Sequence, residues 1–446
     1  RGVRVMNAPP AAPLLLGRDQ LVSLNQSTAA KIIIGLLAMR WLAGIVENYA
    51  FAAISEAAAI VMLAGLACLT LLRMRLATTS IVFVAGVLAW IFTGTLSVSA
   101  NQLSDRTEAL ALITLLLLYG LFANAATTHL QTHSSLILIN RFLRAFIVLG
   151  AALSVAQVAT GSGLVEAGKD HIQRAFGSDV HPVSFAIQMV AALVAREIMR
   201  AKRAAKFRAV HLALLAIGAV ALYLTFARTA WVMAILTVGY VLIMRGTLAR
   251  RAVTFALLAA ISIGLFSLSD RFADLGSLPL FLANFSVQDV VFDWRYVDNS
   301  VSWRIVNWSY GFQQAMEQPY FGFGPGQSAT ASYFNLEMHN IFLEMLFEGG
   351  IFGLAALLLT LAGLVRMHAR LPRASLADRY ARTLANGFGI SLLMAITFST
   401  SFVDQLMSFL LYMILLTAAA VPALHPDVSI QTATSGGPDH RGTARN

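Results

Sequence analysis

The sequence has 446 residues, of which 58% are hydrophobic and only 12% are charged. Charged residues make up about a quarter of an ordinary soluble domain, so this composition excludes one. The formal net charge of +10 does not indicate a nucleic-acid partner, because basic residues of a membrane protein collect on its cytoplasmic side. The single cysteine, Cys68, excludes an intrachain disulfide.

Apolar segments recur along nearly the whole chain, and a helix needs about 20 such residues to cross a bilayer. Hydropathy therefore predicts an all-α polytopic membrane protein with about twelve transmembrane helices. Their approximate limits are 29–46, 51–72, 79–99, 108–126, 137–158, 182–199, 209–227, 230–244, 252–268, 340–365, 384–401 and 405–423. We expect five regions: an N-terminal segment (1–28), spans one to nine (29–268), a long outer loop (269–339), spans ten to twelve (340–423) and a disordered tail (424–446).

Basic residues fall on alternate connections between these spans. They are Arg73 and Arg75; Arg141 and Arg144; the run 196–208; Arg245, Arg250 and Arg251; and the run 366–382. By the positive-inside rule, these connections and both termini are predicted to be cytoplasmic. The opposite connections, 100–107, 159–181 and 269–339, are rich in Asp and Glu and lie on the outer side.

The long outer loop contains a segment, 300–319, with apolar residues at helical intervals. They are Trp303, Ile305, Val306, Phe312 and Met316. We expect an amphipathic helix that lies on the bilayer surface or caps the bundle and ends before Pro319.

Several arginines on the outer side run against the positive-inside rule. Arg106, Arg271 and Arg295 are interpreted as ordinary surface residues, whereas Arg174, Arg228 and Arg304 are the informative ones. Each alone is most simply a snorkelling or ion-paired residue. Arg228 is harder to explain in this way, because a charge within an apolar stretch costs roughly 2.5–3.5 kcal/mol on insertion scales. Arg40, in the first span, is a lesser case. Because guanidinium groups match phosphate oxygens in pairs, several outer arginines around one site would form a phosphate or diphosphate clamp.

The stretch "GFGPGQ" after Pro319 lacks the Lys-Ser/Thr ending of a phosphate-binding P-loop, and we expect it to bend the loop back to the membrane. His339 follows, and we expect it in the first turn of the tenth span. Its imidazole suits proton transfer near neutral pH, although a purely structural place at the helix start explains it equally well. His171 and His181 are alternative outer histidines. His129 and His133 have metal-like spacing but lie in a short cytoplasmic loop, where no metal site is expected.

Three segments together resemble the O-antigen ligase and O-antigen polymerase superfamily. They are "HNIFLEMLFEGGIFG" (339–353), "FARTAW" (226–231) and "VSWRIVNWSYGFQQAMEQPYFGFGPGQ" (301–327). The small residues around Arg228 depart from the family's Ser-Arg-Gly pattern, but the arginine is retained. The resemblance implies a fold similar to GT-C glycosyltransferases. It also implies transfer of glycans from polyprenyl diphosphate carriers on the periplasmic face of the bacterial inner membrane.

Carried over to this sequence, the resemblance implies that Arg228 and Arg304 hold the donor diphosphate and that His339 is essential. Arg174, in an R-x-x-G…HP segment, joins them. We expect an inverting reaction in which His339 is the general base, without metal or cofactor. Asn340 and Asp404 are candidates for binding the acceptor or orienting the histidine.

The leading functional prediction is an O-antigen ligase. Its partners would be undecaprenyl diphosphate-linked polysaccharide as donor, lipid A–core oligosaccharide as acceptor, and membrane lipids. Two alternatives use the same donor, an O-antigen or exopolysaccharide polymerase and a protein O-oligosaccharyltransferase. A transporter or lipid flippase would need unwound spans and a two-half repeat, and the sequence shows neither.

Overall fold

The computed structural model describes most of the chain in ranges separated by short gaps. These ranges are 18–49, 54–73, 77–78, 80–101, 106–165, 173–179, 181–203, 208–249, 251–253, 256–257, 277–288, 290–291, 301–334, 336–398 and 406–423, together with residues 260, 293, 295 and 297. Asp404, His171 and most of the ninth predicted span, 252–268, lie outside the described residues. Residues 1–17 and the predicted tail, 424–446, also lie outside them.

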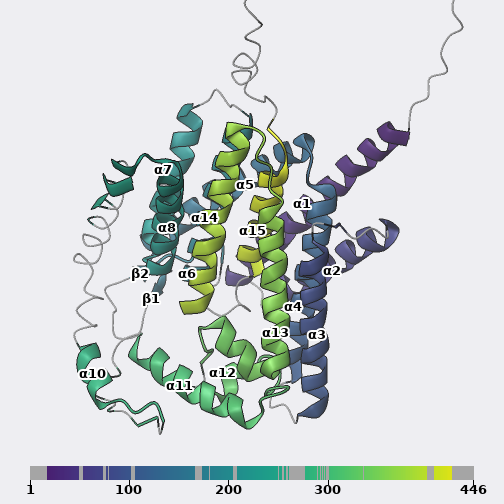
Figure 1. Ribbon diagram of the computed structural model, residues 1–446. Coiled ribbons are helices and arrows are strands. Elements are labelled where there is room, and N and C mark those ends of the chain that lie inside the picture. Colours follow the sequence, from purple (N-terminus) through teal and green to yellow (C-terminus); the bar gives the residue numbers. More distant parts are fainter. Residues whose placement is uncertain are drawn as a thin grey trace, which may run out of the picture.

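Helices dominate the described residues (Figure 1). They are α1 (Arg18–Tyr49), α2 (Ile54–Arg73), α3 (Ile81–Ala100), α4 (Arg106–His129), α5 (His133–Ala159), α6 (Pro182–Arg203), α7 (Arg208–Leu224), α8 (Arg228–Arg245), α10 (Leu278–Asn284), α11 (Ser302–Glu317), α12 (Ser328–Ala331), α13 (Ile341–Ala369), α14 (Leu376–Phe398) and α15 (Leu406–Ala420). Two short strands, β1 (Leu164–Val165) and β2 (Gln173–Arg174), pair antiparallel between α5 and α6. The predicted all-α class therefore holds for the described residues apart from this strand pair.

Eight described helices are long and apolar enough to cross a membrane: α1, α3, α4, α5, α6, α8, α13 and α14. Three shorter apolar helices, 57–70, 209–224 and 406–420, coincide with the second, seventh and twelfth predicted spans. The protein is therefore a polytopic helical membrane protein. The total of twelve spans stays a prediction, because most of the ninth lies outside the described residues.

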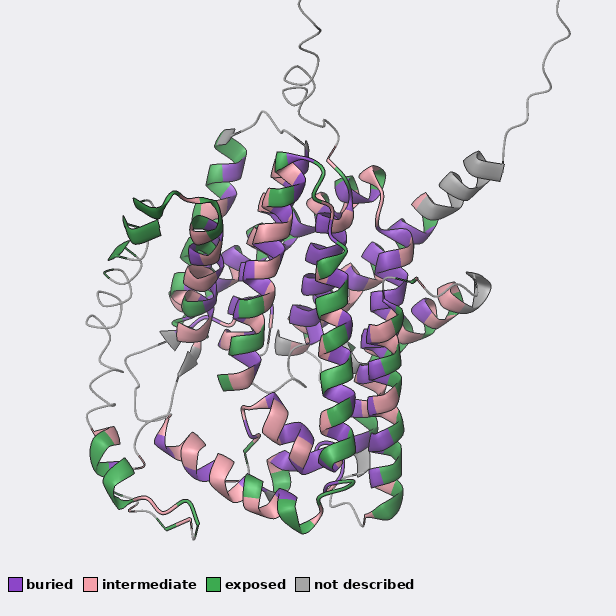
Figure 2. Ribbon diagram, viewed as in Figure 1, coloured by how far each residue is buried: buried purple, intermediate pink, exposed green. Residues whose placement is uncertain are grey.

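The core of the bundle is built around α15, which lies at its centre (Figures 1 and 2). Every residue of this helix from Leu406 to Ala419 is buried, as expected for a helix that is apolar on all sides. Beside it, α3 and α13 approach closely at two glycines. A Cβ at Gly86 would lie 2.5 Å from the backbone nitrogen of Thr360, and one at Gly363 would lie 2.4 Å from Phe83 Cα. Small residues allow such close helix contacts in membranes.

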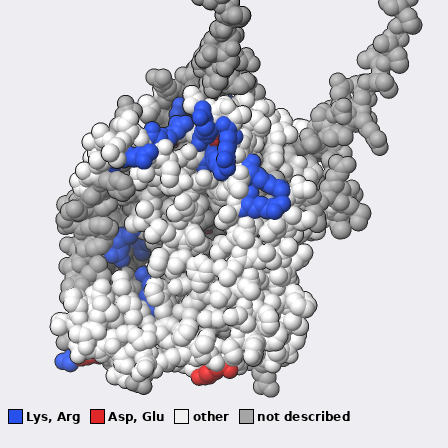
Figure 3. All heavy atoms as spheres, viewed as in Figure 1, with Lys and Arg blue, Asp and Glu red and all other residues white. Residues whose placement is uncertain are grey.

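The two ends of the bundle differ in charge. We call one end the arginine-rich end; Arg245, Arg366, Arg370, Arg373 and Arg379 lie there, at the end of α8 and around the α13–α14 connection. Figure 3 shows a band of Lys and Arg side chains at this end, at the top of the view. The first described turn of α1 and the chain after α15 lie at the same end (Figure 1). This agrees with the predicted sharing of one side by the basic connections at α8 and at α13–α14, whereas the side of the termini and the assignment of that side to the cytoplasm stay predictions.

The opposite end, which we call the loop end, carries α10, α11 and α12 (Figure 1). α11 forms where the amphipathic helix was predicted and ends before Pro319. Two residues of the predicted apolar face, Phe312 and Met316, are 53% and 47% exposed, so they do not pack on the bundle, and their contact with the bilayer surface stays a prediction. The buried residues of α11 are instead Ser302, Val306, Asn307, Gly311 and Ala315. The reason is the close approach of the chain before α13: a Cβ at Gly311 would lie 2.5 Å from Cε of Met338.

Candidate active site

Arg228 is the first residue of α8, after a three-residue turn that joins α7 to α8. The hydroxyl of Thr225 fixes this turn by donating to the carbonyl of Leu222 (2.7 Å) and accepting from the backbone N–H of Ala227 (3.2 Å). Phe226 adopts a φ of 48°, which is rare for a bulky residue. Arg228 is thus held at a helix N-terminus, where both its guanidinium group and the helix dipole favour an anion.

Arg174 is brought to the same place by β2. The backbone N–H of Ala175 donates to the carbonyl of Leu224 (2.9 Å), and Nε of Arg174 donates to the carbonyl of Thr225 (3.1 Å). The strand end therefore lies against the turn that carries Arg228. Arg174 is buried, with 8% of its surface exposed.

Arg304 and His339 both contact the indole ring of Trp303. The guanidinium carbon of Arg304 lies 5.0 Å from the centre of the Trp303 ring. The imidazole of His339 meets the same indole edge-on, with ring centres 5.3 Å apart and planes at 87°. Trp303 was predicted only as an apolar residue of the amphipathic helix, and periodicity gave no sign of this contact.

The segment before His339 is clamped by α11. Nε1 of Trp308 donates to the carbonyl of Met338 (2.6 Å), and the amide of buried Asn307 donates to the carbonyl of Glu337 (3.3 Å). Beneath these bonds lies a small separate core, formed by Ala315, Met338 and Phe347. α11 therefore fixes the position of His339 through backbone contacts and through apolar packing.

His339 does not lie in the first turn of α13, as the sequence had suggested. It stands one residue before the N-cap and has a φ of 53°. The N-cap is Asn340, whose side-chain oxygen accepts from the backbone N–H groups of Phe342 (3.1 Å) and Leu343 (3.2 Å). Asparagine is a preferred N-cap residue, and capping forces the chain out of the helix at this point. His339 is therefore not part of the helix.

The hydrogen bond of the imidazole determines which nitrogen can accept a proton. Nδ1 of His339 lies 2.9 Å from the carbonyl oxygen of Glu337. Because a carbonyl oxygen only accepts, Nδ1 carries the hydrogen. In the neutral ring Nε2 then keeps its lone pair, which is the arrangement that a general base requires.

The glycine-rich stretch after α11 docks onto a kink in α13. Gly350, with a φ of 61°, interrupts the helix. The carbonyls of Phe347 and Glu348 accept from the backbone N–H groups of Phe323 and Gly324, both at 2.9 Å. A Cβ at Gly350 would lie 2.3 Å from the carbonyl oxygen of Tyr320, so no other residue fits there without a shift. The stretch bends the loop back, as predicted, and it also ties the loop to the helix that follows His339.

Five cationic or titratable side chains influence one another around this site: Arg174, His181, Arg228, Arg304 and His339. We call this set the cationic cluster. Each member is an electrostatic neighbour of two others, in the cyclic order Arg174, Arg228, Arg304, His339, His181. Figure 3 shows Lys and Arg side chains in a recess on this face, between the lower ends of α7 and α8 and the beginning of α11.

Burial and like charges lower the pKa values in this cluster. Burial, followed by the charge of Arg228, lowers the pKa of Arg304 to about 10 and also lowers that of Arg174. Burial, with Arg304 and His181, lowers the pKa of His339 to about 4, although its bond to Glu337 acts in the opposite direction. At neutral pH the arginines are therefore charged and His339 is neutral. The site combines fixed positive charge with an unprotonated imidazole.

The other predicted residues have different surroundings. Asp404 lies outside the described residues. Arg40 lies within reach of the charges of Asp179 and Glu47, so acidic side chains lie near it. Among the described residues, no group of three or more His, Cys, Asp or Glu side chains is arranged to hold a metal ion. Metal independence itself stays a prediction.

The fold and the cluster define a class of protein: a polytopic helical membrane protein with an anion-attracting, histidine-containing site at one end of its bundle. Residues 212–358 match the family model described as O-antigen ligase. The matched segment includes Arg228, Arg304 and His339 but not Arg174. This match, which covers about a third of the chain, supports the resemblance to the O-antigen ligase and O-antigen polymerase superfamily that the sequence motifs had indicated. No curated protein matches the sequence.

Proposed function

We propose that this protein is an O-antigen ligase with a GT-C-like fold. It would transfer O-antigen polysaccharide from undecaprenyl diphosphate to lipid A–core oligosaccharide at the periplasmic face of the inner membrane. The family match over residues 212–358 supports a glycosyltransferase-like function on polysaccharide and lipid substrates. The observation that carries the finer assignment is the convergence of Arg174, Arg228 and Arg304 beside His339, from three segments far apart in the chain.

The three arginines would bind the donor diphosphate. Guanidinium groups pair with phosphate oxygens through two parallel hydrogen bonds, and their charge persists at neutral pH even after burial. When the bond between C1 of the sugar and the diphosphate breaks, the electron pair passes to the diphosphate oxygen. Fixed arginines stabilise this developing charge without reorganisation.

His339 would accept the proton of the acceptor hydroxyl. The hydroxyl oxygen attacks C1 on the face opposite the diphosphate, so the C1–O bond to the acceptor forms with inversion. The proton passes to Nε2, because Nδ1 is bonded to Glu337. Binding of the anionic diphosphate would raise the pKa of His339 from its value in the empty site, which favours proton acceptance as the donor is engaged.

The test is transfer between two purified substrates. Purified protein is given undecaprenyl diphosphate-linked glycan and lipid A–core in EDTA, and the joined product is followed by gel mobility and mass spectrometry. We expect product formation with the chelator present. Chain growth on the carrier without transfer to lipid A–core would assign the protein as a polymerase. Transfer to a pilin would assign it as a protein O-oligosaccharyltransferase.

Two substitutions test the assigned roles. Arg228→Lys keeps the charge but loses the paired hydrogen bonds, and we expect about a 100-fold loss of transfer, typical of removing one transition-state donor. Arg295→Lys is the matched control, because Arg295 lies in the loop that precedes α11 and bonds Asp293 (Nε to Oδ1 3.0 Å) outside the cationic cluster. His339→Ala should abolish transfer, whereas His133→Ala, at the first residue of α5, should not. Near-normal turnover of Arg228→Lys or of His339→Ala would overturn the corresponding role.

A further inference from the structure

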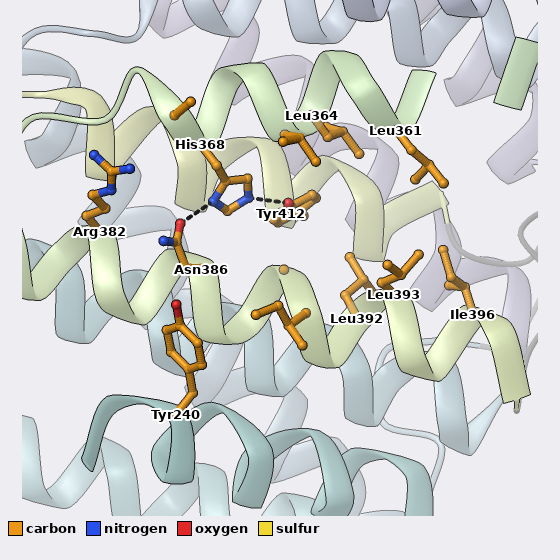
Figure 4. A pocket seen from close by; sticks show the side chains of 14 residues that line it. Tyr240, Leu361, Leu364, His368, Arg382, Asn386, Leu392, Leu393, Ile396 and Tyr412 are labelled. Carbon is orange, nitrogen blue, oxygen red and sulfur yellow. Dashed lines mark hydrogen bonds between the residues drawn. The ribbon is translucent and has the colours of Figure 1, made fainter. Parts of the chain in front are cut away.

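A groove of about 370 Å³ lies between α13 and α14 (Figure 4) and does not include the cationic cluster. Its walls are aliphatic, with Leu361 and Leu364 on α13 facing Leu393 and Ile396 on α14. Both nitrogens of His368, on its surface, are engaged in hydrogen bonds, Nδ1 with Oδ1 of Asn386 (2.8 Å) and Nε2 with the hydroxyl of Tyr412 (2.5 Å). The groove is therefore mainly an apolar surface whose polar groups satisfy one another.

The groove continues into a second cavity of about 790 Å³ at the arginine-rich end. Tyr240, Arg382 and Asn386 line both. Four arginines line the second cavity: Arg245, Arg373, Arg379 and Arg382. None of its described lining residues is acidic. The nearby Asp378 is buried and ion-paired with Lys202 at 2.8 Å, so it does not neutralise these arginines. The cavity is thus suited to an anion.

The groove has the depth of one membrane leaflet. Asn386 and Ile396 are ten residues apart on α14, so they span about 15 Å along the helix axis, half of the ~30 Å hydrocarbon core. The groove is also open to the bilayer, since the lining residues Val365, Ile390 and Leu393 are 68%, 49% and 39% exposed. An occupant can enter laterally from the lipid phase.

We propose that the joined cavities bind an anionic glycerophospholipid of the leaflet at the arginine-rich end. Its phosphate lies among Arg373, Arg379 and Arg382, and one acyl chain lies in the groove between α13 and α14. The arginines of the second cavity suit the phosphate, and the apolar groove, which has the depth of one leaflet, suits the acyl chain. A polyprenyl chain is several times longer than the slot. The site does not depend on the proposed transfer reaction.

The test is lipid retention by the purified, delipidated full chain. Native mass spectrometry measures binding of dioleoyl phosphatidylglycerol, dioleoyl phosphatidylcholine and undecaprenyl phosphate at matched ratios. We expect preferential retention of phosphatidylglycerol. The double substitution Arg379→Gln with Arg382→Gln should weaken it about 25-fold, about five-fold for each basic residue near the anionic headgroup. Arg366→Gln, an exposed arginine at the same end but outside both cavities, is the matched control and should leave binding unchanged.

A second variant tests the groove without touching the arginines. Leu393→Trp fills the slot and should also reduce phosphatidylglycerol retention, with thermal unfolding followed to confirm that the protein remains folded. Equal retention of phosphatidylcholine, or unchanged binding in both the double variant and Leu393→Trp, would overturn the proposal. Tighter retention of undecaprenyl phosphate, lost in the same variants, would replace the glycerophospholipid by an isoprenoid phosphate.

Discussion

Replacing Arg304 with glutamine tests the electrostatic link between the arginines and the histidine. The guanidinium carbon of Arg304 lies 5.0 Å from the centre of the Trp303 ring, and the imidazole centre of His339 lies 5.3 Å from it. The two groups are therefore at most about 10 Å apart. At ~10 Å and an effective dielectric constant of ~20, two unit charges repel by about 1.7 kcal/mol, or about 1.2 pKa units. Removing the positive charge favours the imidazolium form. The pKa of His339 should therefore rise from about 4 to about 5. It should stay below the ordinary value of about 6.5, because burial, the largest cause of its depression, is unchanged.

The measurement is an NMR pH titration of imidazole nitrogens in protein selectively labelled at histidine, with His339 assigned from the spectrum of His339→Gln. Arg295→Gln serves as the control, since it removes an arginine that pairs with Asp293 and is not an electrostatic neighbour of His339. A pKa of His339 that stays at about 4 in Arg304→Gln, or that falls, would refute the reasoning. A rise of the same size in Arg295→Gln would show that net charge, not the local contact, sets the value.

Three further predictions concern pH, the kink and the core. In the proposed mechanism, transfer requires neutral His339 and is lost as pH falls through its pKa. Since the free protein has a value of about 4, kcat/KM for the donor should stay flat from about pH 7.5 to about pH 6, whereas an acid limb near 6.5 would contradict the assignment. Gly350→Ala should lower the unfolding temperature and transfer, because its φ is 61° and its Cβ would meet Tyr320, while Gly349→Ala, with no neighbour within 4 Å, should preserve both in the same assays. Lys202→Met leaves the charge of Asp378 buried without its ion-pair partner and should cost about 3–5 kcal/mol in denaturant unfolding in detergent; a cost below about 1 kcal/mol would show that the pair is dispensable.

The spans could be predicted from sequence because the bilayer imposes a simple length and polarity rule. For example, the predicted limits of the seventh and eighth spans, 209–227 and 230–244, place Arg228 at the connection between α7 and α8 to within a few residues. The pairing of Arg174 with that turn could not be predicted in the same way. It depends on backbone hydrogen bonds from Ala175 and on the course of β2, and neither leaves a periodic signal in the sequence.

Two features of this region depend on backbone-level packing, which the apolar pattern does not report. Phe312 and Met316 lie on the predicted apolar face of α11, but the side that meets protein holds small residues because the chain around Met338 passes too close for larger ones. Hydrophobic periodicity does not distinguish a face that meets protein from one that meets lipid. Likewise, His339 lies outside the helix because Asn340 caps it, and a cap shifts a helix start by a residue or two without altering the apolar pattern.

The kink at Gly350 has a mechanical consequence. The stretch after α11 hydrogen-bonds to the interrupted turn of α13, and α11 hydrogen-bonds to the chain before His339. We therefore expect α11, this stretch and the first part of α13 to move as one unit. Arg304 and His339 lie on that unit, whereas Arg174 belongs to β2 and Arg228 to α8. In the proposed mechanism, a hinge that widens the site for a lipid-linked sugar would therefore separate the first pair from the second, and His339 would move together with Arg304.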